Sequence, residues 1–109
     1  MAQNTVKALE LSTLNATALT TSYQAINGTG FLYPVFYMRI VNDSNQDITI
    51  SYDGTTDHEY VPSGDTFNFP SQSNAQPNSG VSLWSARTVV YVKAGAAGTG
   101  TIALSGYYN

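Results

Sequence analysis

Apolar and polar side chains alternate in the middle of the chain with the period of a pleated strand. Within residues 35–41, three large apolar side chains alternate with a second set that has the polar Arg39 at its centre. The apolar set is Phe36, Met38 and Ile40, and the second set is Tyr37, Arg39 and Val41. Successive side chains of a strand point to opposite faces of a sheet, so the apolar set is predicted to face the core. The face that carries Arg39 is predicted to meet solvent or a partner.

The next segment has the pattern of a β-hairpin. Residues 47–52 place two isoleucines and a tyrosine on one side and small polar residues on the other. Asp53-Gly54 follows at once, and this dipeptide favours the positive φ angles of tight hairpin turns. We therefore predict a tight turn there and a short returning strand over residues 58–61, ended by Pro62.

Another strand is predicted over residues 65–69. Phe67 and Phe69 share one of its faces, and Pro70 ends it because proline has no backbone N–H to donate. Residues 71–80 have no apolar side chain larger than alanine or proline, which is typical of an exposed loop. This loop is too short to separate two domains.

The end of the chain is predicted to form a second hairpin. Residues 88–93 are rich in β-branched and aromatic side chains, and residues 101–108 place Ile102 and Leu104 on one face. Residues 95–100 are rich in glycine and alanine, and we expect them to connect the two strands.

The whole pattern predicts an all-β domain. About eight short strands with turn signals between them are typical of a β-sandwich, either a jelly roll, which we favour, or an immunoglobulin-like sandwich. Residues 1–30 favour strands over a short helix. We expect one domain over residues 1–109, in which residues 1–20 either fold with the sandwich or form an extended N-terminal arm.

Composition narrows the classes of function. The 109 residues include no cysteine, which removes disulfides, thiolate metal sites and cysteine nucleophiles. Four scattered basic residues and a net charge of −3 argue against nucleic-acid binding, because affinity for phosphates grows with clustered lysine and arginine. No apolar stretch reaches the roughly 18 residues of a membrane helix, and the N-terminus has no signal-peptide pattern. We expect folding in a cytoplasm and no membrane partner.

The densest group of ionisable residues surrounds the predicted hairpin turn. Asp53, Asp57 and Glu59 are candidate Ca²⁺ ligands, although their spacing matches neither an EF-hand loop nor a two-histidine metal helix. Acidic residues are also common in solvated turns, where an aspartate side chain caps the turn, and we favour this interpretation. His58 is the only histidine and no nucleophile motif accompanies it, so we expect no catalytic residue and no cofactor.

One stretch resembles a known group of proteins. Residues 39–64 carry the pattern I-x-I-S-x-D-G-x-x-D-x-x-x-V-P, preceded by N-x-S and followed downstream by residues 90–93 and a glycine-rich end. This combination resembles small structural proteins of tailed bacteriophages, and the resemblance covers residues 36–108. It implies a virion component with a terminal β-hairpin, and it supplies no catalytic residue.

The resemblance and the composition lead to the same expectation. Only 10% of the residues are charged, which is typical of a surface partly covered by other proteins. We expect a capsid decoration or cement protein in the virion, bound to the major capsid protein or other virion proteins and forming a homo-oligomer, either a dimer or a trimer. The alternatives are a neck, tail or head-fibre component, and a carbohydrate-binding sandwich that contacts the host surface through Trp84 and the loop over residues 53–59. The candidate contact residues are all aromatic, namely Tyr33, Phe36, Tyr37, Trp84 and Tyr108.

Overall fold

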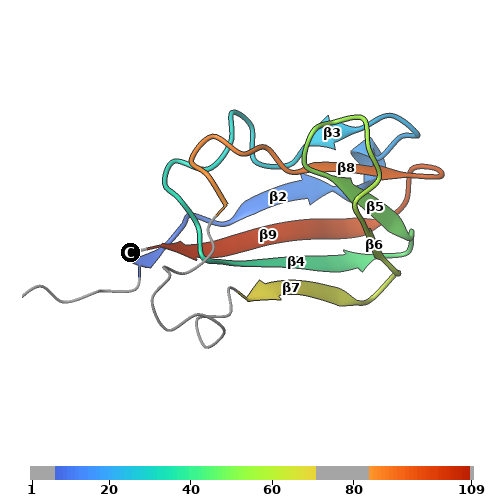
Figure 1. The fold of residues 1–109 in the computed structure, drawn as a ribbon. Coiled ribbons are helices and arrows are strands. Elements are labelled where there is room, and N and C mark those ends of the chain that lie inside the picture. The colour runs from blue at the N-terminus through green and yellow to red at the C-terminus, as the bar shows by residue number, and fades with distance from the viewer. Residues whose placement is uncertain (1–6, 71–83, 109) are drawn as a thin grey trace, which may run out of the picture.

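The computed structural model describes residues 7–70 and 84–108, which form a sandwich of two antiparallel β-sheets (Figure 1). One sheet, sheet A, has the strand order β1-β9-β4-β7, with β2 also paired to β9. The other, sheet B, has the order β3-β8-β5-β6. The prediction of an all-β sandwich is therefore confirmed, with nine strands in the described part of the chain.

The strands are short except at the centre of sheet A. Their bounds are β1 Lys7–Ala8, β2 Ser12–Asn15, β3 Gln24–Ala25, β4 Tyr37–Ser44, β5 Ile48–Ser51, β6 Glu59–Val61, β7 Thr66–Pro70, β8 Tyr91–Ala94 and β9 Gly100–Tyr108. Between β2 and β3 lies a short 3₁₀ helix, η1 (Ala16–Ala18), whose N-cap Asn15 accepts a hydrogen bond from the backbone N–H of Thr17. Within the described ranges no helix is long and apolar enough to cross a membrane.

Sheet A is built around β4 and β9, which pair along the whole length of β4. Ile40 and Leu104 face each other across this pair and point into the sandwich, where they are 0% and 2% exposed. Arg39 lies on the outer face, as the alternation predicts. Phe36 does not belong to the buried set, and that part of the prediction is wrong. It lies in a bend before β4, because Val35 is already bridged to another segment of the chain.

The core fills the space between the two sheets. Phe67 and Phe69 are half-buried and pack against it from β7, as the sequence pattern predicts. The inward positions predicted for Ile48, Ile50, Ile102 and Leu104 are confirmed. Ser51, predicted on the outer side with Thr49, is instead buried, and its hydroxyl bonds to Asp53. The largest fully buried apolar side chains come from both layers and their connections, and they are Leu19, Val35, Met38, Ile40, Ile48, Ile50, Val61, Val90, Val92 and Ile102.

The N-terminal strands lie along sheet A. β1 pairs with the end of β9, and β2 pairs with its first half, where Asn15 is the partner of Thr101 and Ser12 the partner of Leu104. Residues 7–15 therefore extend the sheet of their own chain. Residues 1–6 and the loop predicted over residues 71–80 lie outside the described residues.

The predicted hairpin at the end of the chain is wrong. β8 lies in sheet B between β3 and β5, whereas β9 lies in sheet A, so residues 95–99 carry the chain from one sheet to the other. The backbone passes closely at this crossing: Gly100 has a φ of +106°, and a Cβ atom there would lie 2.1 Å from the carbonyl oxygen of Asp43. Alternation assigns each strand a buried face but no neighbour, so it does not distinguish a hairpin from a crossing.

Candidate functional site

Five aromatic side chains gather at the end of the sandwich where β9 finishes. Figure 1 shows the C-terminus at this end, beyond β9. The start of β4 lies next to the end of β9, because Tyr37 pairs with Tyr107 in the register of sheet A. The segment before β4 bends back to the same place, where the backbone N–H of Phe36 donates to the carbonyl of Tyr107 at 3.1 Å. We call this set the aromatic end, and its members are Tyr33, Phe36, Tyr37, Tyr107 and Tyr108.

Contacts between the rings order the aromatic end. Tyr33 and Tyr108 stack with 4.2 Å between ring centroids and 9° between ring planes. Tyr37 and Tyr107 are tilted by 52° with 5.6 Å between centroids, and the Tyr37 hydroxyl donates to Asn68 Oδ1 at 3.1 Å. The rings remain accessible, since Tyr33 is 45% and Tyr107 39% exposed. Aromatic surface that is already ordered loses little conformational entropy when a partner covers it.

A hollow of about 260 Å³ lies next to these rings on the outer face of sheet A. Its walls are formed by Phe36, Tyr37, Arg39, Ser105 and Tyr107. The rings offer apolar area, and the arginine offers hydrogen-bond donors that suit a carboxylate. An aromatic or acidic side chain of a protein partner fits this combination.

Trp84 lies apart from the aromatic end. Its indole packs against Tyr52 and Phe69, with ring centroids 4.4 Å and 4.9 Å away, and its backbone is bridged to Val35. Trp84 Nε1 and the Tyr52 hydroxyl are buried with no hydrogen-bond partner among the described residues. Burial, followed by the charge of Glu59, raises the pKa of Tyr52. Trp84 is thus a half-buried packing residue, and the structure does not bring it to the other predicted contact residues.

The predicted tight turn at Asp53-Gly54 is wrong, because a wider loop over residues 52–58 joins β5 to β6. Asp53 Oδ1 accepts the backbone N–H groups of Thr55 and Thr56 at 2.8 Å and 2.7 Å. These hydrogen bonds, that of Thr56 first, hold the pKa of Asp53 well below its usual value. An aspartate that caps its own loop in this way is common in turns.

Asp57 connects the same loop to sheet B through Lys93 on β8 and Tyr23 just before β3. Its carboxylate pairs with Lys93 at 3.1 Å and accepts a short hydrogen bond from the Tyr23 hydroxyl. The bond from Tyr23, followed by that from Lys93, lowers the pKa of Asp57. Burial, followed by the bond to Asp57, raises the pKa of Tyr23 to about 12. Lys93 also lies over the Tyr23 ring, 4.6 Å from its centroid, so the three side chains form one cluster.

Two of the three candidate calcium ligands, Asp53 and Asp57, already have other partners. Over residues 7–70 and 84–108, no three histidine, cysteine, aspartate or glutamate side chains are grouped as a metal site. Asp53 caps its loop, Asp57 pairs with a lysine, and Glu59 is half-buried on β6. The exposed His58 also has a structural contact, because its Nδ1 accepts the backbone N–H of Tyr52 at 3.0 Å.

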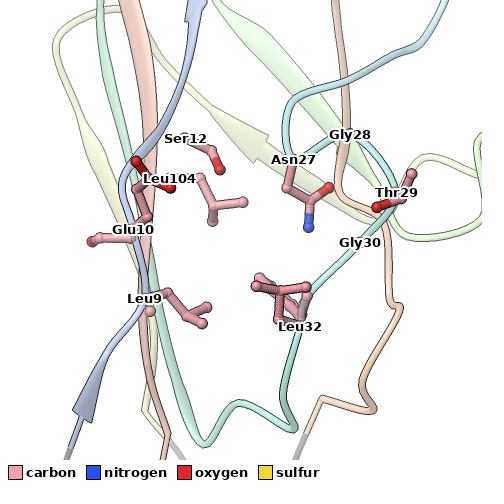
Figure 2. A pocket seen from close by; sticks show the side chains of 12 residues that line it. Leu9, Glu10, Ser12, Asn27, Gly28, Thr29, Gly30, Leu32 and Leu104 are labelled. Atoms are coloured by element: carbon pink, nitrogen blue, oxygen red, sulfur yellow. The ribbon is translucent and has the colours of Figure 1, made fainter.

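A larger hollow of about 430 Å³ opens between the edges of the two sheets. Figure 2 shows Leu9 and Leu104 projecting into it from sheet A and Leu32 from the opposite wall. The polar Asn27 on that wall is already engaged, since it bonds the backbone of two residues before β8. The lining suits an apolar side chain better than a charged ligand.

The structure therefore brings together four of the five aromatic contact residues predicted from the sequence. It adds Tyr107, which the prediction missed although alternation along residues 101–108 places it on the face opposite Ile102 and Leu104. Only the register of β9 against β4 puts its ring beside Tyr37.

Comparison with known proteins identifies no relative. The chain matches no protein-family model, no curated protein and no solved structure. The resemblance to tailed-phage structural proteins stays a prediction, and the site is interpreted from its geometry.

Proposed function

We propose that this chain is a structural protein of a bacteriophage virion, a decoration or cement protein that binds the outside of the assembled capsid. The observation that carries the proposal is the aromatic end, where ordered and partly exposed rings gather on a weakly charged sandwich. The resemblance of residues 39–64 to tailed-phage structural proteins supplies the partner, the major capsid protein.

Aromatic anchors account for much of the energy of protein–protein binding, because they bury a large area at a low cost in conformational entropy. The stacked Tyr33 and Tyr108 form the tip of the aromatic end, and Leu32 next to Tyr33 in the chain is 70% exposed. Contact with a capsid subunit at this tip removes apolar surface from water.

The mechanism is mass action. A protein that binds the assembled lattice and not the free subunits lowers the free energy of the lattice by its binding free energy. Each copy contributes a small amount, and a shell carries many equivalent sites. Stabilisation of the shell therefore requires no chemical step.

The neck, tail or head-fibre alternative uses the same surface and differs in the number of copies. The carbohydrate-binding alternative relied on an exposed Trp84, whose ring instead packs against Tyr52 and Phe69. It therefore has no support from the geometry of that residue.

Quantitative mass spectrometry of purified virions tests the proposal by counting copies of this chain against the major capsid protein. Hundreds of copies per particle are expected for a decoration protein. About a dozen or fewer would move the chain to the neck or tail, because those structures have low rotational symmetry. A chain missing from the particles would refute the virion proposal.

The contact surface is tested with shells that lack the protein. Purified Tyr33→Ala and Tyr108→Ala variants are expected to co-sediment with such shells about tenfold more weakly than the wild type. Tyr60→Ala is the matched control, since Tyr60 is 62% exposed on the outer face of sheet B. Equal binding by all three variants would remove the aromatic end from the contact.

A further inference from the structure

The outer face of sheet A carries very little charge. β4 and β9 present every second side chain outward, and Arg39 and Asp43 are the only charged members of this outward set. The other members are small, hydroxyl-bearing or aromatic. In register across the two strands, the outward rows are Tyr37 with Tyr107, Arg39 with Ser105, Val41 with Ala103, and Asp43 with Thr101.

Neither of these two charges is paired within the described part of the chain, where the one ion pair joins Lys93 to Asp57. Both Arg39 and Asp43 are exposed. They stand four residues apart on β4, which corresponds to about 13 Å along a strand. That separation is too long for the two side chains to pair with each other.

A second copy of the chain supplies both missing partners if it packs face to face on sheet A about a two-fold axis at Val41. When this axis lies in the interface and perpendicular to β4, the two β4 strands run antiparallel, and Arg39 of each copy faces Asp43 of the other. An axis parallel to β4 would set Arg39 against Arg39. The charge pattern therefore selects the perpendicular axis.

The same axis brings uncharged side chains against one another at the centre of the face. Val41 and Ala103 are half-buried and meet their own copies at the centre of the face. Tyr107, four residues from Ala103 on β9, falls near the start of β9 of the other copy.

We infer that the protein forms a two-fold dimer through the outer face of sheet A, held by reciprocal Arg39–Asp43 pairs around a centre of Val41 and Ala103. The four strands β2, β9, β4 and β7 make this face about 19 Å wide, and the eight residues of β4 make it about 26 Å long. This footprint of about 500 Å² per copy lies at the lower end of specific interfaces, so a weak dimer is expected.

The dimer goes beyond the proposed function and does not depend on it. In this arrangement the two Tyr33–Tyr108 tips lie at opposite ends of the dimer. A dimer with two identical tips can bind two capsid sites related by a two-fold axis of the shell. Once the first tip is bound, binding of the second is intramolecular, which strengthens the attachment.

Charge reversal with rescue tests the reciprocal pairs by sedimentation velocity of the purified protein. Arg39→Asp sets two carboxylates against each other at both pairs, and we expect the dissociation constant to rise about tenfold or more. The double variant Arg39→Asp with Asp43→Arg restores opposite charges and is expected to return within about threefold of the wild type. Arg87→Asp is the control, because it changes net charge equally in the exposed loop before β8.

Cross-linking tests the position of the axis. The chain has no cysteine, so one introduced cysteine reports one position. Face-to-face sheets lie about 10 Å apart, whereas a disulfide needs Cα atoms within about 7 Å, so a short bis-maleimide is the suitable reagent. Val41→Cys is expected to give covalent dimers at concentrations where Tyr60→Cys, on the outer face of sheet B, gives none.

The outcomes separate this inference from the virion proposal. A wild-type protein that is monomeric up to high micromolar concentration, or trimeric, overturns the dimer. So does a dimer that Arg39→Asp leaves unchanged, or one that the double variant fails to rescue. A dimer that follows the expected pattern stands even if purified virions contain no copy of the chain.

Discussion

Asn42 provides a sharp test of how the two sheets are joined. It points inward from β4 and is 0% exposed. Its side-chain amide donates to the carbonyl oxygens of Gln46, Val61 and Pro62 at 2.8, 3.0 and 3.2 Å. Its Oδ1 accepts the Ser44 hydroxyl at 2.5 Å. One side chain therefore connects the end of β4 in sheet A with the end of β6 in sheet B.

The loss in free energy of unfolding expected for Asn42→Ala follows from these hydrogen bonds. The two N–H groups of the side-chain amide share these three acceptors, so replacing Asn42 by alanine removes the equivalent of two donated hydrogen bonds, each contributing about 1 kcal/mol. The bond to Val61 is buried, and leaving its carbonyl unpaired costs about 1 kcal/mol more. We expect Asn42→Ala to lower the free energy of unfolding by about 3 kcal/mol, a large share of the roughly 5–15 kcal/mol of a typical domain.

Urea and thermal unfolding followed by circular dichroism measure this loss. For a domain of this size, about 3 kcal/mol lowers the Tm by roughly 12–24 °C. Asn68→Ala is the matched control, since Asn68 is exposed and accepts one hydrogen bond from Tyr37, and we expect it to cost less than about 1 kcal/mol. If Asn42→Ala cost no more than the control, the assignment of Asn42 as the connection between the sheets would be wrong.

Three further predictions concern the crossing at Gly100, the cluster of Tyr23 with Asp57, and the packed indole of Trp84. In urea unfolding, Gly100→Ala is expected to lower the free energy of unfolding by at least about 2 kcal/mol, because the new Cβ clashes with the backbone. Gly64→Ala, which has open space around it, is expected to lower it by about 1 kcal/mol. Equal losses in the two variants would contradict the clash. In a ¹³Cζ NMR titration Tyr23 is expected to ionise with a pKa of about 12, and Asp57→Asn to lower that midpoint. Because this pKa exceeds the unfolded value of about 10, the Tyr23 environment contributes stability that is fully present below pH 10 and is lost as the pH rises toward 12. An unchanged midpoint in Asp57→Asn would argue against the contact between Tyr23 and Asp57. Trp84→Ala is expected to lower the free energy of unfolding by about 3 kcal/mol while leaving shell binding by the folded protein unchanged, and weaker binding would return Trp84 to the contact surface.

The positions and inward faces of the central strands followed from alternation. The patterns over residues 47–52 and 101–108 correctly predict β5 and β9 with their buried sides. Alternation is informative there because a strand with one buried face must repeat with a period of two. The interruption at Phe36 was missed, since it depends on the bridge between Val35 and Trp84 from a distant part of the chain.

The partners of the strands did not follow from the sequence. A glycine-rich connection between two apolar strands is compatible with a hairpin and with a crossing between sheets, and here β8 and β9 belong to different sheets. The dipeptide Asp53-Gly54 likewise marks a reversal of the chain, but the bonds that Asp53 makes to Thr55 and Thr56 widen it to a loop. Both outcomes depend on contacts that a local pattern does not encode.

The sequence by itself determined the all-β class, the low charge, the lack of cysteine and the supply of aromatic side chains, because these are properties of composition or of short-range periodicity. Only the tertiary structure decided that Tyr37 meets Tyr107, that Trp84 packs inward, and that the outward row of β4 carries its two charges on one weakly charged face. Each of these depends on which strands become neighbours and in which register. That choice is made by side-chain packing between segments far apart in the chain, where a shift of one residue would reverse every face.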